Sequence, residues 1–129
     1  MTSEKLIELA KSAREKAYAP YSGFLVGAAL LSESGEVFTG CNIENASFTP
    51  TCCAERVAIF KAVSEGVTDF RALAVVGGKA GESASDACYP CGVCRQVLSE
   101  HADASLKIYF ADGSETTLGE LLPWAFDLK

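Results

Sequence analysis

The sequence has no long hydrophobic run, a single histidine and fewer basic than acidic residues. Its longest apolar stretch, residues 24–31, contains a glycine and is far too short to span a bilayer. The first residues alternate charged with apolar side chains and contain no apolar block of the kind that signal peptides carry. We therefore expect a cytoplasmic protein that makes no contact with membranes.

The shortage of basic residues bears on the class of substrate. The net charge is −6, and the 11 Lys and Arg residues are scattered among 17 acidic ones. Proteins that follow a nucleic-acid backbone need a basic stripe, because their affinity grows with each phosphate that they neutralise. DNA and RNA are therefore disfavoured as partners, whereas a small neutral metabolite is compatible with this charge.

The sequence has the composition of an ordinary globular domain. It has 129 residues, of which 49% are hydrophobic and 22% charged, so we expect a single domain over residues 1–129. Helical spacing predicts a helix over residues 3–18, ended by Pro20, and buried helices after Thr51 and from Pro90. Gly66 is the expected C-terminal cap of the first buried helix.

The remaining apolar runs predict strands. They lie at residues 24–31, 36–43, 70–77 and 106–111, with a short strand at 115–117 and a helical turn at 118–122. Ser34-Gly35 and Asp112-Gly113 are the expected turns. Strands that alternate with helices favour an α/β fold: a three-layer α-β-α sandwich, with a mixed central sheet and helices on both faces.

Three of the six cysteines have the spacing of metal ligands. Cys91 and Cys94 lie three residues apart at a predicted helix start, so their sulfurs face the same way. Cys53 lies at the start of the other buried helix. Helix N-termini lower thiol pKa values, and three thiolates are good ligands for zinc. Three ligands leave the fourth position of a tetrahedral site for water.

Glu55 follows Cys53 by two residues, and we expect it to act as a proton shuttle. Zinc lowers the pKa of a bound water from about 15.7 to roughly 7. A carboxylate beside the metal, but not bound to it, can take the proton from that water and return it to a substrate. Such general acid–base help typically contributes about 10²- to 10⁴-fold in rate.

Two other uses of these cysteines stay open at this point. A structural zinc site with four cysteines could take its fourth sulfur from Cys88 or Cys52, and thioredoxin-like redox chemistry could use Cys91 and Cys94 alone. The redox alternative leaves Cys53 and Glu55 without a role, so the residues favour catalytic zinc first and structural zinc second. His101, late in its predicted helix, is more typical of a helix end than of a catalytic base.

The sequence resembles the small, homotetrameric zinc-dependent cytidine deaminases of the cytidine/deoxycytidylate deaminase superfamily. The resemblance begins with Cys53-Ala54-Glu55 and Pro90-Cys91-x-x-Cys94, which are similar to the three-cysteine form of the zinc nucleobase deaminase signature. It then extends over almost the whole chain, through residues 18–24, 26–29, 40–45, 60–66, 94–97 and 121–123.

The resemblance implies hydrolytic deamination of cytidine and 2′-deoxycytidine to uridine and 2′-deoxyuridine, a reaction of pyrimidine salvage that releases ammonia. Glu55 would move the protons, and one zinc ion per subunit would be held by Cys53, Cys91 and Cys94. Asn42 and Glu44 match the pair that holds the ribose 3′-hydroxyl, and residues two apart at a strand end point the same way.

The resemblance also implies roles for residues that would otherwise be ordinary. Phe24 matches the aromatic that stacks on the pyrimidine, and the Ala54 amide would contact the base. Phe126 matches an aromatic that reaches a neighbouring subunit's site in tetrameric relatives. Arg56 matches an arginine that bonds to ligand sulfurs, where it would offset the −1 charge of three thiolates and Zn²⁺.

The chain departs from its relatives at two positions. Phe48 stands where relatives usually have tyrosine, and Tyr89 stands where serine or threonine often precedes the Pro-Cys pair. The Tyr89 side chain would narrow the pocket, which bears on the range of substrates.

Two other functions compete with cytidine deamination as hypotheses. One is deamination of a cytosine-containing antibiotic such as blasticidin S, against which Asn42 and Glu44 favour a ribose. The other, from a different class, is a non-catalytic zinc module that binds a partner protein and in which Glu55 is dispensable.

Overall fold

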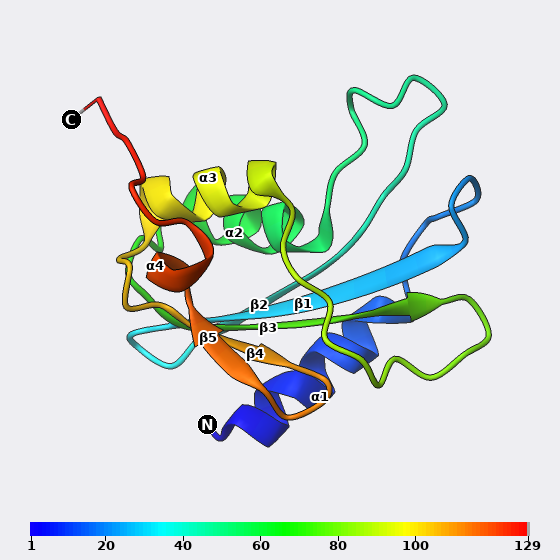
Figure 1. Ribbon diagram of the computed structural model, residues 1–129, viewed down its shortest axis with the longest axis horizontal. Helices are drawn as coiled ribbons and strands as arrows, with labels where there is room; N and C mark the ends of the chain where they lie inside the picture. Colours follow the sequence, from blue (N-terminus) through cyan, green and yellow to red (C-terminus); the bar gives the residue numbers. More distant parts are fainter. Residues whose placement is uncertain (129) are drawn as a thin grey trace.

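The computed structural model describes residues 1–128 and contains one five-stranded sheet in the order β2-β1-β3-β4-β5 (Figure 1). Strand β1 pairs antiparallel with β2 and β3, β3 pairs parallel with β4, and β4 pairs antiparallel with β5. The elements in chain order are α1 (Ser3–Arg14), β1 (Phe24–Ser32), β2 (Val37–Cys41), α2 (Ala54–Ser64), β3 (Phe70–Lys79), α3 (Gly92–His101), β4 (Lys107–Phe110), β5 (Glu115–Thr117) and α4 (Leu118–Leu121).

The expected three layers are confirmed. Helix α1 covers one face of the sheet, and α2 and α3 cover the other (Figure 1). Each face has its own buried cluster: Leu6 and Ala10 of α1 pack on one, and Ala58 and Ile59 of α2 pack on the other. Among the described residues, no helix is both long and apolar enough to cross a membrane.

Two glycines let the helices approach the sheet closely. A Cβ added at Gly27 would lie 2.0 Å from the Ala10 carbonyl oxygen of α1, and one at Gly40 would lie 2.4 Å from the Ala54 carbonyl oxygen of α2. Neither position has room for a side chain, so each glycine fixes how near its helix lies to the strands. Gly40 thereby places the first turn of α2 directly over β2.

Some predicted boundaries are wrong by a few residues. Helix α1 ends at Arg14 rather than at residue 18, because the amides of Glu15, Lys16 and Ala17 bond three residues back instead of four. The Tyr18 amide then donates to Asn42. Pro20 disfavours helical geometry at the residue before it, which is consistent with this early end.

Both ends of the first buried helix, α2, follow the sequence signals. Helix α2 begins at Ala54 with Cys53 as its N-cap, and Gly66 adopts φ +86° just after the helix. Helix α3 likewise has Cys91 as its N-cap, so Pro90 precedes the cap rather than being the first helical residue. In both helices, therefore, a cysteine occupies the position where backbone amides are left without helical partners.

Four strands also differ in length from the predictions. Strand β1 runs one residue further, to Ser32, and β4 spans Lys107–Phe110 rather than 106–111. Strand β3 runs to Lys79, two residues beyond the prediction, because Phe24 and Leu25 pair with Lys79 and Gly78. Strand β2 ends at Cys41 instead of residue 43, and beyond it Ile43 makes isolated bridges to Tyr18 and Cys52. The predicted turns at Gly35 and Gly113 are confirmed, with φ +98° and +87°.

Candidate active site

The N-termini of α2 and α3 bring three sulfur atoms together. The Cys53 Sγ lies 3.8 Å from the Cys91 Sγ, which lies 3.5 Å from the Cys94 Sγ. All three sulfurs lie within 4.8 Å of one another, and among residues 1–128 they form the one group that could hold a metal ion. The Cys94 amide points at the Cys91 Sγ at 3.5 Å, so the helix end itself faces the cluster.

The cluster is built to carry negative charge. Hydrogen bonds from the Cys94 thiol, and then from Arg56 and Cys91, lower the pKa of Cys53 to about 5 against the opposing effect of burial. The pKa of Cys94 is raised in turn, because its thiol donates to Cys53. A thiolate flanked by two further sulfurs is a donor set that suits Zn²⁺.

The two neighbouring cysteines do not join the cluster. Cys52 and Cys88 line the same cleft, but their sulfurs are not part of the converging group. Burial raises the pKa of Cys88 to about 11, which keeps it a neutral thiol. Burial likewise raises the pKa of Cys52. The geometry thus leaves the three-sulfur site open on its cleft side, as a catalytic site requires.

Glu55 lies in the first turn of α2, beside the sulfurs. Its side chain is 4% exposed and lines the cleft, which has a volume of about 340 Å³. Burial, with a smaller contribution from the charge on Cys53, raises the pKa of this carboxyl to about 7. A carboxyl with a pKa near neutrality can both accept and donate a proton at physiological pH.

Arg56 extends from the same turn toward the sulfurs. Its Nη2 lies 3.4 Å from the Cys53 Sγ and 3.5 Å from the Thr51 carbonyl oxygen. Its hydrogen bond to Cys53, and to a lesser degree the charge on that sulfur, raises the pKa of Arg56. The Arg56 Nε is buried and has no hydrogen-bond partner among the described residues. The guanidinium therefore lies against the sulfur cluster.

Asn42 and Glu44, which follow the end of β2, line the same cleft. The buried Asn42 amide joins β1: its Oδ1 accepts from the Val26 amide and its Nδ2 donates to the Phe24 carbonyl oxygen, both at 2.8 Å. Glu44 accepts from the Ser22 hydroxyl and amide and from the Tyr21 amide, and these bonds lower the pKa of its carboxyl. Glu44 is thus an ionised acceptor at the rim.

Of the remaining predicted site residues, Phe24 and Ala54 line the cleft and Phe126 does not. Phe24 is 40% exposed and lines the cleft, and the fully buried Ala54 lines it at the start of α2. Phe126 does not line this cleft and is 67% exposed. It belongs to the C-terminal segment, which extends away from the body of the molecule (Figure 1).

Sequence reasoning missed one residue that shapes the cleft. Ser22 holds the Glu44 carboxylate, and its place in the Pro20-Tyr21-Ser22-Gly23 turn, where Gly23 adopts φ +68°, was the available signal. Tyr89, expected from the sequence to narrow the pocket, does line the cleft, and its ring packs edge-on against Phe110 with centroids 4.9 Å apart. No pattern in the sequence pairs Tyr89 with Phe110, because that contact depends on the tertiary structure.

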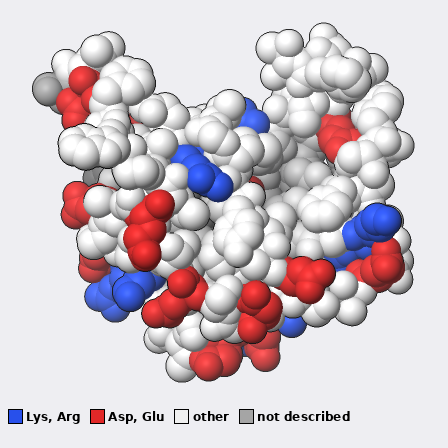
Figure 2. Space-filling view, viewed as in Figure 1, with Lys and Arg blue, Asp and Glu red and all other residues white. Residues whose placement is uncertain are grey.

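Among the described residues, no basic side chain lines the cleft. The described residues that line it are Ser22, Phe24, Val26, Asn42, Glu44, Thr51, Cys52, Cys53, Ala54, Glu55, Cys88, Tyr89 and Cys91. On the face seen in Figure 2, which is hollowed between two projections, the basic residues do not gather into a stripe. A phosphate group would therefore meet no cation in this cleft.

Comparisons with known proteins agree with this site. The family described as "Cytidine and deoxycytidylate deaminase zinc-binding region" matches residues 1–110. A cytidine deaminase of Sporosarcina psychrophila is 52% identical over 130 residues, covering 98% of this chain and 92% of the relative. A blasticidin-S deaminase of Bacillus cereus is 32% identical over 128 residues, covering 94% of this chain and 91% of the relative.

A solved structure shows the same fold. The crystal structure of a cytidine deaminase from Burkholderia pseudomallei aligns with a TM-score of 0.87 and 49% identity, covering 98% of this chain and 100% of the other. The matched region contains the three converging cysteines and Glu55. The chain belongs to the zinc-dependent cytidine and deoxycytidylate deaminase family.

Proposed function

We propose that this protein catalyses the hydrolytic deamination of cytidine and 2′-deoxycytidine. Water adds to C4 of the pyrimidine, the bond between C4 and the amino nitrogen breaks, and uridine or 2′-deoxyuridine leaves with ammonia. The observation that carries this proposal is the buried Glu55 beside the Cys53, Cys91 and Cys94 sulfurs, in a cleft that also contains Asn42 and Glu44.

Cys53, Cys91 and Cys94 are the residues that would hold zinc, one ion per chain. When bound, zinc lowers the pKa of water and so supplies a nucleophile near neutral pH. Arg56 bonds to Cys53 and offsets the charge of the thiolates, which keeps the site electron-poor. Glu55 accepts one proton of the attacking water and donates it to ring N3; it then takes the proton of the new hydroxyl at C4 and donates it to the departing amine.

The other cleft residues orient the nucleoside. Glu44, held ionised by Ser22, accepts a hydrogen bond from a ribose hydroxyl, and the Asn42 amide contacts the same hydroxyl. Phe24 stacks on the pyrimidine, and the Ala54 amide contacts the base. The lack of Lys and Arg in the lining favours a nucleoside without a phosphate over deoxycytidylate or a polynucleotide.

We also propose a homotetramer in which the Phe126 side chain completes a neighbouring subunit's cleft. Support comes from its exposure and from its position outside its own cleft. Size-exclusion chromatography with light scattering should give the mass of four chains, and a monomer would overturn this part. A cytoplasmic location fits the six free cysteines, because thiols persist in a reducing compartment.

The test is the loss of cytidine absorbance in the ultraviolet, with zinc-loaded wild type and Glu55→Ala. We expect turnover of cytidine and deoxycytidine, and a loss of about 10³-fold or more in the variant with zinc retained. Absence of turnover by zinc-loaded wild type on both substrates would refute the assignment. Blasticidin S serves as a third substrate, and turnover of it alone would assign the antibiotic-deaminating activity instead.

A further inference from the structure

Phe24 separates the active-site cleft from a second cavity. This cavity has a volume of about 400 Å³ and is bordered by the end of β3 and the loop over residues 80–88. Phe24 and Cys88 are the two residues that line both spaces, so together they form the wall between them. Because open space lies on either side of the Phe24 ring, its position depends on the few atoms that touch its edge.

Phe24 and Cys88 both pack against Gly77. Gly77 lies in β3 directly opposite Val26 of β1 and is buried. A Cβ at this position would lie 2.6 Å from the Cys88 Sγ and 3.0 Å from the Phe24 Cε2. Both distances are shorter than ordinary van der Waals contact. The Phe24 ring and the Cys88 thiol therefore occupy the space that a side chain at residue 77 would need.

The reason for glycine here is space rather than backbone geometry. Gly77 is absent from the glycines with positive φ, so an alanine could adopt its backbone conformation. Gly78, the next residue, differs: an added Cβ there would approach Ala84 and Arg14 at 3.3 to 3.4 Å and would not meet Phe24 or Cys88 among its nearest atoms. The two adjacent glycines thus give a matched pair for substitution: a methyl group at Gly77 would meet Phe24 and Cys88, whereas one at Gly78 would meet Ala84 and Arg14.

We propose that Gly77 and Cys88 are positioning residues that set the place of the Phe24 ring against the pyrimidine. Gly77 leaves the space, and the Cys88 sulfur fills it and holds the ring edge. The proposal rests on the base-stacking role proposed above for Phe24. Stacking needs close contact between ring and base, so a small displacement of Phe24 into the cleft weakens substrate binding without touching the groups that move protons.

Gly77→Ala in the zinc-loaded enzyme tests this directly. We expect the KM for cytidine to rise about tenfold and kcat to change less than about threefold. Gly78→Ala, the matched control, should keep both values near wild type. The double variant Gly77→Ala/Cys88→Ala removes the sulfur that meets the new methyl group, gives the ring room to move back, and should restore most of the KM.

A second substitution keeps the test decisive if Gly77→Ala does not fold. Cys88→Met adds volume at the same wall and should raise the KM in the same way. An unchanged KM in a folded, zinc-loaded Gly77→Ala or Cys88→Met variant would overturn the proposal, as would a KM rise that Cys88→Ala does not relieve. Phe24→Ala distinguishes a failure of this positioning proposal from a failure of the stacking role proposed for Phe24. If Phe24→Ala leaves the KM unchanged while wild type is active, the stacking role itself is wrong.

Discussion

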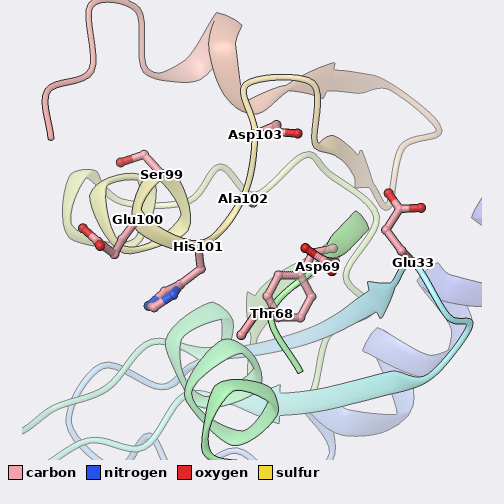
Figure 3. A pocket seen from close by; sticks show the side chains of 9 residues that line it. Glu33, Thr68, Asp69, Ser99, Glu100, His101, Ala102 and Asp103 are labelled. Carbon is pink, nitrogen blue, oxygen red and sulfur yellow. The ribbon is translucent and has the colours of Figure 1, made fainter. Parts of the chain in front are cut away.

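The two ends of helix α3 border cavities of similar size and opposite chemistry. At its N-terminus, Cys91 lines the cleft of about 340 Å³. At its C-terminus, Glu100 and His101 line a cavity of about 350 Å³ together with Glu33, Asp69 and Asp103, contributed by other parts of the chain (Figure 3). The second cavity is lined by four carboxylates and the single histidine, whereas the cleft is lined by two carboxylates and four cysteines.

The difference between the two ends lies in convergence and helix polarity. Backbone amides at a helix N-terminus favour thiolates, whereas the carbonyls at a C-terminus oppose further negative charge. At the acidic end, no three of the described ligand-type side chains converge, and Glu33 pairs instead with Arg71 at 3.3 Å. Volume and polarity therefore do not mark the functional site, whereas three sulfurs beside a buried carboxyl do.

Removing one converging sulfur should have the largest effect. We expect Cys91→Ser to lose zinc and to lower cytidine deamination by about 10³-fold or more, because a hydroxyl is a poor substitute for a thiolate ligand. Metal analysis by mass spectrometry, paired with the absorbance assay, measures both. Cys88→Ser and Cys52→Ser should still bind one zinc per chain. Zinc loss in either of these would mean that the site uses a fourth sulfur.

Glu55 should make the metal-free protein less stable as the pH rises. Its pKa is about 7 when folded and 4.5 in the ordinary state. Between these values the unfolded chain loses the proton while the folded chain keeps it, so the carboxyl destabilises the fold increasingly up to pH 7. Chemical denaturation of metal-free Glu55→Gln and wild type should show no growing difference below pH 4.5 and about 3 kcal/mol in favour of the variant above pH 7. A constant difference across this range would contradict the assignment.

Substitution of Arg56 should affect activity and zinc retention, whereas substitution of Arg71 should not. Arg56→Ala should lower activity or zinc retention by about ten- to a hundredfold while the fold stays intact, because the Cys53 sulfur loses its cationic partner. Arg71→Ala, at the acidic end, removes an exposed ion pair and should leave both unchanged. Turnover with zinc titration measures the difference. Wild-type activity and zinc content in Arg56→Ala would refute the charge-offsetting role.

The sequence was sufficient for the layers and for the convergence of the sulfurs. The spacing of Cys91 and Cys94 and the helix-start position of Cys53 are local signals, and local signals survive folding. What escaped prediction depends on contacts between distant segments. Helix α1 ends early where Tyr18 joins Asn42, and Gly77 has no room for a side chain because Phe24 and Cys88 pack against it.

His101→Ala should have the smallest effect, and it tests the comparison from the acidic end. The side chain is half-buried in the last turn of α3, where a histidine suits the helix dipole. We expect stability to change by about 0.5 kcal/mol and turnover to stay within about twofold of wild type, because the cleft lining does not include His101. Thermal unfolding and the absorbance assay give both values on one preparation. A tenfold loss of turnover with zinc retained would show that the two ends of α3 are coupled, and the acidic cavity would then belong to the catalytic machinery.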